Sequence, residues 1–259
     1  MILRFALLFA LSFSISATSH TVHTNTHHET QTIANITLPS SPTISKALDF
    51  ARANMDNQTY NHVLRSWLTA QASLSHLPAS IQDKVDTEVL AVSSILHDLG
   101  WSKNPALISA NKRFEVDGAD VSREFLKREG KGDWNERRVQ LVWDAIALHT
   151  TRDINLYKEP EVWLTSVGIL AELAGPAAAI RTVGADRVAV TQGEWDGIAK
   201  EFPRKGLREY FKGVIVGFCA TKPSTTYQNF MGDYGERYLQ GYTRDGKKVV
   251  DFYDANLLE

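Results

Sequence analysis

Apolar residues recur every three or four positions over most of residues 43–220, which is the period of an α-helix. The clearest run covers about 80–99, where one face holds Val85, Val89, Val92, Leu96 and Leu99. Gly100 follows at once and is a natural stop for this helix. Only residues 247–252 show even a weak form of the apolar and polar alternation that a half-buried strand requires. The pattern therefore predicts an all-α fold.

Further helices are predicted where the same spacing returns. They begin near residue 43 and near 57 or 59, cover 117–129, run from about 133 to 149, and recur at 194–201 and 204–218. Asp133 followed by Glu136 resembles a capping pattern. Pro160 opens another helix, which Gly175-Pro176 ends, because proline in the first turn lacks only an amide hydrogen that needs no partner there. Residues 150–158 are predicted as a loop, and the chain from 222 onward as irregular.

The first 17 residues have the features of a secretory signal peptide. Arg4 precedes an apolar run over residues 5–13, and small residues follow it. The run is too short to span a bilayer comfortably, so we expect cleavage near Ala17 rather than an uncleaved anchor. The protein is then expected to be secreted or to enter the secretory pathway, with no membrane span after cleavage.

Composition divides the remaining chain into three parts. Residues 18–42 are rich in Ser, Thr, His and Asn and are predicted to form a flexible leader. The four histidines of this leader are either part of a solvated linker or a metal-scavenging tract; they are His20, His23, His27 and His28. Residues 43–220 are expected to form one helical domain, and residues 221–259 a tail that packs on it.

Charge and cysteine content narrow the chemistry. The 28 basic and 30 acidic residues are well mixed and leave a formal net charge of −2, so nucleic acid is not an expected partner. Cys219 is the only cysteine, which excludes an internal disulfide. Any metal must therefore be held by nitrogen and oxygen ligands.

Three separated stretches carry candidate ligands. His97-Asp98 places an imidazole beside a carboxylate at the end of the most apolar helix, where both are costly to leave without a partner. His62 lies 35 residues earlier on the preceding predicted helix. Glu172 shares an apolar stripe with Thr165 and Ile169 on a later helix. A metal ion is one partner that all four side chains would accept.

This order of residues resembles the HD superfamily of metal-dependent hydrolases, and more closely the fungal HD-domain proteins of the cyanamide hydratase type. The resemblance covers about residues 45–180. The matching segments are Asn61-His62, Leu96-His97-Asp98-Leu99-Gly100, Arg113–Gly118, Ile146–His149 and Glu172–Gly175.

The resemblance implies an orthogonal helical bundle around one divalent transition metal, zinc or iron, held by His62, His97, Asp98 and a distal acid. The family's distal acid is usually Asp, whereas we place Glu172 there. Either the longer acid still binds, or the metal shifts, or catalysis has been lost. The resemblance also implies water activation by the metal, with Asp98, Glu115 and His149 in catalytic roles.

Each of these residues also has a purely structural interpretation. Glu172 would then pair with an arginine such as Arg181, and Glu115 with Arg113 or Lys112. His149 would then fill core space on an apolar helix face. Trp101 follows the His-Asp turn and is a candidate for the pocket wall, while the segment 222–230 either folds over the site as a lid or packs outside the bundle.

Three functions remain open from the sequence. The first is a hydratase or hydrolase of a small polar molecule, similar to cyanamide hydratase. The second is a phosphohydrolase, for which the candidate cations are Lys103, Lys112, Arg113 and Arg152. The third is a secreted protein with the HD fold and no catalysis. The oligomeric state stays open.

Overall fold

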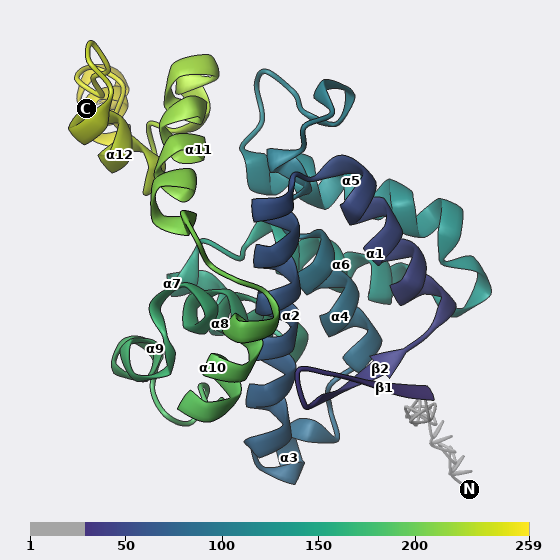
Figure 1. The fold of residues 1–259 in the computed structure, drawn as a ribbon. Coiled ribbons are helices and arrows are strands. Elements are labelled where there is room, and N and C mark those ends of the chain that lie inside the picture. The colour runs from purple at the N-terminus through teal and green to yellow at the C-terminus, as the bar shows by residue number, and fades with distance from the viewer. Residues whose placement is uncertain (1–28, 259) are drawn as a thin grey trace, which may run out of the picture.

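The computed structural model describes residues 29–258. Within them lie thirteen α-helices, most of which form a bundle with a two-stranded sheet at its edge (Figure 1). The prediction of an all-α fold is confirmed. The predicted signal peptide and the histidines at 20–28 lie outside the described residues and stay predictions. None of the described helices is both long and apolar enough to cross a membrane.

The elements follow one another along the chain with short connections. The sheet consists of β1 (Glu29–Ile33) and β2 (Ile36–Ser40). The bundle contains α1 (Pro42–Asn54), α2 (Asn57–His76), α3 (Ala79–Gln82), α4 (Thr87–Leu96), α5 (Phe114–Glu129), α6 (Glu136–Ala147), α7 (Arg152–Asn155), α8 (Pro160–Ala174), α9 (Pro176–Val183) and α10 (Gln192–Glu201). The last three helices are α11 (Leu207–Thr221), α12 (Met231–Tyr238) and α13 (Val249–Asn256). Short 3-10 turns occur at Leu99–Trp101, Pro105–Leu107, Lys131–Asp133 and Pro223–Thr225.

Helix α4 is the centre of the bundle. All its residues from Glu88 to Leu96 are buried, and helices α1, α2, α6 and α8 pack around it. A helix that is apolar on nearly every side is stable only when neighbours cover all of its faces. The end of α4, which carries the His-Asp pair, is therefore held rigidly inside the core.

The predicted helix over 80–99 is divided in two in the structure. α3 ends at Gln82, and Asp86 starts α4 by accepting hydrogen bonds from the backbone N–H groups of Glu88 and Val89, each at 3.1 Å. An aspartate in this position stabilises a new helix start, so it competes with continuation of the preceding helix.

Two smaller expectations also need correction. Asn135, not Asp133, caps α6 by accepting from the N–H of Arg138 at 3.0 Å. The predicted loop over 150–158 contains the short helix α7.

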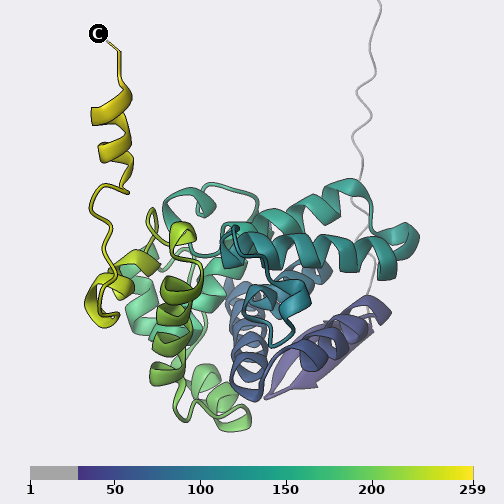
Figure 2. The same ribbon diagram turned by 90° about the horizontal axis from the view of Figure 1, so that it is seen from above.

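Residues 29–40 form a β-hairpin, so the prediction of a flexible leader is wrong over this stretch. Ala34 and Asn35 form its turn with φ of 50° and 62°, and such left-handed pairs suit the twist of a two-residue hairpin loop. Ile36 and Leu38 are buried against the bundle, and this burial supplies the apolar contact that a lone hairpin lacks. The hairpin lies at the edge of the bundle in Figure 2.

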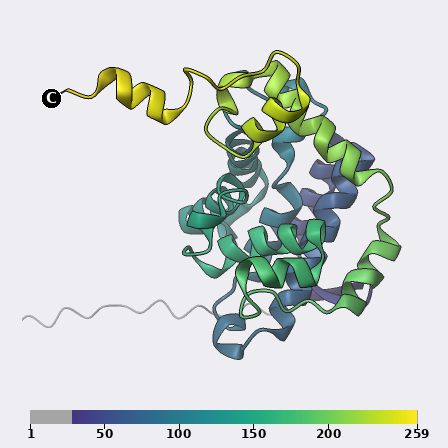
Figure 3. The ribbon, with the colours of Figure 1, turned by 90° about the vertical axis from the view of Figure 1, so that its left-hand side faces the viewer.

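The tail is not irregular throughout, because it contains two α-helices. α12 and α13 lie in it, and the weak strand candidate at 247–252 falls largely within α13, which extends away from the bundle in Figure 2 and Figure 3. α11 and α12 share a small core of their own that packs on Phe114. Lys222 anchors this unit, because its buried ammonium group lies 2.8 Å from the buried Asp117 carboxylate of α5. We call residues 207–242 the cap.

The close contact between α2 and α8 at Gly168 provides a test of the packing. A Cβ at Gly168 would lie 2.5 Å from the Ala70 Cβ and 2.9 Å from the Ser66 carbonyl oxygen. Gly168→Ala should therefore lower the free energy of unfolding by about 1–3 kcal/mol through overpacking, as measured by chemical denaturation. Gly213→Ala in α11 is the matched control, since no atom lies within 4 Å of its added Cβ. That change should leave stability equal or slightly higher. Equal behaviour of the two variants would contradict the α2–α8 packing.

Candidate metal centre

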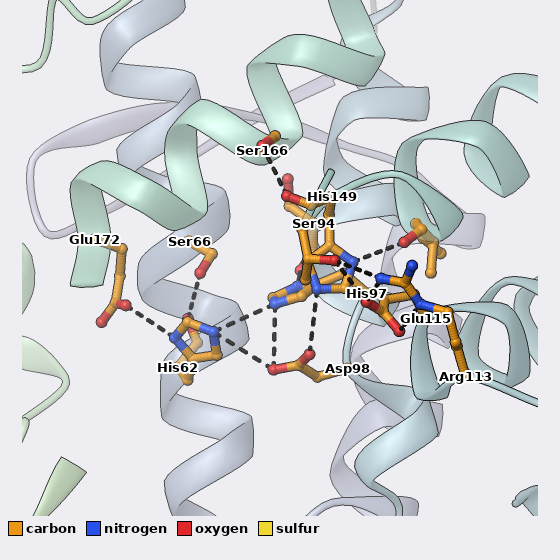
Figure 4. A network of polar contacts seen from close by, with 12 residues as sticks. His62, Ser66, Ser94, His97, Asp98, Arg113, Glu115, His149, Ser166 and Glu172 are labelled. Atoms are coloured by element: carbon orange, nitrogen blue, oxygen red, sulfur yellow. Dashed lines mark hydrogen bonds and ion pairs between the residues drawn. The ribbon is translucent and has the colours of Figure 1, made fainter. Parts of the chain in front are cut away.

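Helices α2 and α4 bring three donor side chains together. His62 projects from α2, and His97 and Asp98 lie at the end of α4 (Figure 4). One donor atom from each of the three lies within 4.8 Å of the others, and all three side chains are at most 3% exposed. The predicted convergence of these separated stretches is therefore present in the structure.

The turn after α4 holds His97 and Asp98 in place through a close contact with α5. A Cβ at Gly100 would lie 1.9 Å from the Phe114 carbonyl oxygen, so only glycine permits this approach. Gly118 of α5 lies against the His97 carbonyl oxygen, and a Cβ added at Gly118 would lie 3.1 Å from that oxygen. The two glycines let α5 support the His-Asp turn directly.

Hydrogen bonds fix which nitrogen of each imidazole faces the centre. His62 Nδ1 lies 2.9 Å from Glu172 Oε2, and His97 Nδ1 lies 2.8 Å from the Ser94 carbonyl oxygen. An ionised carboxylate and a carbonyl oxygen can only accept, so each Nδ1 carries a hydrogen. In the neutral rings, both Nε2 atoms then present lone pairs to the centre.

The distances among these atoms match the edges of a metal coordination shell. His62 Nε2 and His97 Nε2 are 3.3 Å apart, and Asp98 Oδ2 lies 3.5 Å from the first and 3.2 Å from the second. Adjacent ligands around an ion with bonds of about 2.0–2.2 Å are separated by roughly 3.0–3.5 Å. Two lone pairs that face each other so closely need a shared cation between them, either a metal ion or a proton.

The carboxylate of Asp98 is an unsatisfied buried charge. Both its oxygens are buried, and neither accepts a hydrogen bond from any residue in 29–258. Burial alone would raise the pKa of Asp98, but positive charge on the adjacent His97 imidazole, 3.2 Å away, and more weakly on His62, lowers it below its usual value. A buried carboxylate held in its charged form requires positive charge beside it, and a divalent cation supplies it.

His149 lies at the edge of this group. Its Nδ1 is 2.7 Å from the Ile146 carbonyl oxygen, so Nε2 is the free nitrogen, and it lies 3.9 Å from Asp98 Oδ1. Burial, together with the nearby His97, lowers the pKa of His149 to about 4. The ring is therefore neutral near pH 7 and presents a lone pair close to the three donors.

Glu172 does not lie among the donor atoms, which corrects the prediction that it is a metal ligand. Its carboxylate contacts the opposite nitrogen of His62 and also binds Arg65 Nε at 2.5 Å and an Arg204 nitrogen at 3.1 Å. Burial would raise the pKa of Glu172, but His62, Arg65 and Arg204 lower it to about 2. The acid therefore orients His62 from outside, as carboxylates behind metal-binding histidines do. The arginines that it binds are not the Arg181 considered from the sequence.

Arg65 and Arg204 were not singled out from the sequence. Arg65 had a readable signal, because it lies within the apolar segment 64–68, three residues after His62 on the same helix, where a guanidinium needs a partner. Arg204 had none, because it lies in the connection before α11 and reaches Glu172 only through the tertiary fold.

Glu115 is fully buried and pairs with Arg113, as one of the two structural interpretations expected. The Thr150 hydroxyl donates to the same carboxylate at 2.5 Å. Lys112 instead binds Asp120 at 2.7 Å. Glu115 thus braces the residue that follows His149 and does not line the cavity.

A cavity of about 230 Å³ opens beside the donors. Its other walls come from the 3-10 turn at Leu99–Trp101, from α5, α7 and α8, from the connection between α6 and α7, and from the cap. The residues are Trp101, Phe114, Thr150, Arg152, Ser166, Ile169, Leu170, Leu173, Phe211, Phe230 and Tyr234. Trp101 lines the pocket as expected, and Phe230 places the segment 222–230 partly over the site rather than outside the bundle. A wider surface hollow of about 640 Å³ lies against α12 and holds none of the donor atoms.

Residues 59–174 match the family model of the HD domain. The match begins in α2, ends with α8, and contains His62, His97 and Asp98. HD domains bind divalent metals and are generally metal-dependent hydrolases. No curated protein matches the chain.

The position of Glu172 predicts how metal binding responds to substitution. Glu172→Gln should weaken zinc affinity by about 10- to 100-fold and leave one ion bound at saturation, because all direct donors remain. His97→Ala should cause a larger loss, since it removes a donor. Competition with a chromophoric chelator measures both. Glu194→Gln is the matched control, because it alters a carboxylate 2.9 Å from the His76 imidazole, a pair that does not include the donor residues. Complete loss of zinc binding in Glu172→Gln would instead indicate that Glu172 is a direct metal ligand.

Proposed function

We propose that this HD-domain chain is a metal-dependent hydratase or hydrolase of a small molecule, with chemistry like that of cyanamide hydratase. The observation that carries the proposal is the buried Asp98 carboxylate, which has no arginine or lysine partner among residues 29–258 and lies beside two imidazole nitrogens at the floor of a cavity. In a core with no binding function, this buried charge would lower the free energy of unfolding without any compensation.

His62, His97 and Asp98 are the residues that would hold the cation. A divalent zinc or iron ion there would supply Lewis acidity and a water molecule of lowered pKa. The ligand set of two nitrogens and a carboxylate suits either metal.

The remaining residues offer a hydrogen-bond acceptor and exclude solvent. His149 is buried and neutral near pH 7, so its Nε2 is able to accept a hydrogen bond from a group in the cavity. Thr150, held by Glu115, fixes the chain next to this imidazole. The aromatic walls formed by Trp101 and Phe114 keep bulk water away and strengthen the electrostatic interactions inside.

The phosphohydrolase alternative has weaker support. Of the four candidate cations, Arg113 and Lys112 are occupied by Glu115 and Asp120, and Lys103 does not line the cavity. Arg152 alone among them faces it, and one guanidinium is not the cluster of cations that a nucleoside triphosphate requires.

The non-catalytic alternative rested on Glu172 in place of the usual aspartate. Because Glu172 supports His62 from behind, its identity does not by itself remove a direct donor from the centre. The cavity beside the donors also remains wide enough for a small substrate.

Turnover of cyanamide tests the proposed reaction. The protein loaded with zinc, or with iron, should convert cyanamide to urea, and Asp98→Asn should reduce the rate to background because the anionic donor is lost. Asp120→Asn is the control, since this half-buried carboxylate binds Lys112 and Trp143 outside the cavity and should leave the rate unchanged. If the metal-loaded protein forms no urea but cleaves phosphate esters, the phosphohydrolase alternative replaces the proposal.

A further inference from the structure

The apolar wall of the cavity extends beyond the HD match. The cap contributes Phe211, Phe230 and Tyr234, which lie across from Ile169 and its neighbours on α8. Trp101 stacks edge-on to Phe211, with ring centroids 5.6 Å apart, so the cap joins the wall beside the donors. Figure 3 shows α11 and α12 seated over this end of the bundle. A substrate body in this half must be apolar to replace the water it displaces.

The acids around the cavity are already neutralised, with one exception. Glu172 is bound by two arginines, and Glu115 by Arg113. Asp98 is therefore the one carboxylate lining the cavity that has no arginine or lysine partner among residues 29–258. A divalent ion held there would face only one carboxylate, so the loaded pocket would carry net positive charge.

Arg152 adds to this charge. It lines the cavity from α7, is exposed, and its side chain forms no hydrogen bond or ion pair with any residue that the structure describes. The planar guanidinium matches a single carboxylate with two parallel hydrogen bonds. The other guanidinium groups near the centre, those of Arg65, Arg113 and Arg204, all bind buried carboxylates.

We propose that the substrate joins one anionic group to an apolar body about the size of a single ring, and that Arg152 selects the charge. The cavity volume of about 230 Å³ lies below the 300–1,000 Å³ of sites for drug-sized ligands, which limits the body to this size. This proposal rests on the proposed function only in placing the reacting centre near Asp98. The recognition itself requires no turnover.

Binding of two probes of equal shape tests the proposal. Benzoate and benzamide differ in charge but share one ring. Isothermal titration of the zinc-loaded protein should show benzoate binding at least about tenfold more tightly than benzamide, the range of a charge-assisted hydrogen bond. Arg152→Gln should abolish this preference. Arg208→Gln is the matched control, because Arg208 is an exposed arginine of the cap that does not line the cavity, and it should keep the preference.

Two further arms separate the sources of affinity. Acetate should bind more weakly than benzoate, because it lacks the apolar body. The same titrations on metal-free protein remove direct binding of a carboxylate to zinc, and the effect of Arg152→Gln should persist there. The proposal is overturned if the wild-type protein shows no preference for benzoate over benzamide, or if Arg152→Gln retains that preference. It is also overturned if phenyl phosphate binds more tightly than benzoate to both the wild-type and the Arg152→Gln protein. These results are independent of urea formation, so either proposal can fail without the other.

Discussion

The structure depends on one unfavourable feature, the burial of the Asp98 carboxylate. The fold removes this group from water, and no hydrogen-bond donor of residues 29–258 takes the place of the water. Such a charge costs several kcal/mol unless a cation lies beside it. The two imidazole lone pairs beside this carboxylate also require a cation. The bundle accepts this cost because α4 is covered on every face, so that neither the His-Asp turn nor its neighbours can relax toward solvent. A metal ion would convert the cost into binding energy, and part of the free energy of folding would then depend on the metal.

Around this centre, each layer constrains the one inside it. Glu172 fixes the tautomer of His62, and Arg65 and Arg204 keep that acid ionised despite its burial. Arg204 lies just before the cap, so the chain that covers the pocket is tied to the same network that orients a donor. Lys222 and Asp117 fasten the other end of α11 to the helix that supports the His-Asp turn. The cap and the centre are thus mechanically linked through buried ion pairs.

The division of labour within the pocket follows from this arrangement. The HD segment supplies the polar floor, where His62, His97 and Asp98 lie, whereas residues beyond it supply much of the apolar wall. Loops and added elements commonly set specificity on a shared scaffold, because they change without disturbing the core. The cap of this chain occupies that position, and Arg152 of the short helix α7 adds charge at the same pocket.

Local sequence was sufficient for the features that depend on neighbours along the chain. The apolar period revealed most helices, and His97-Asp98 beside Gly100 marked the centre, because an apolar helix that ends in an acid must be buried with a partner. Tertiary structure alone decided the rest. Glu172 shares a stripe with apolar residues, but only the packing of α8 on α2 determines which nitrogen of His62 it meets. The hairpin at 29–40 is polar in composition and is stable because the bundle buries Ile36 and Leu38. Side-chain partners separated by more than a hundred residues, as His62 and Glu172 are, leave no periodic signal, since their contact is set by helix packing and not by spacing.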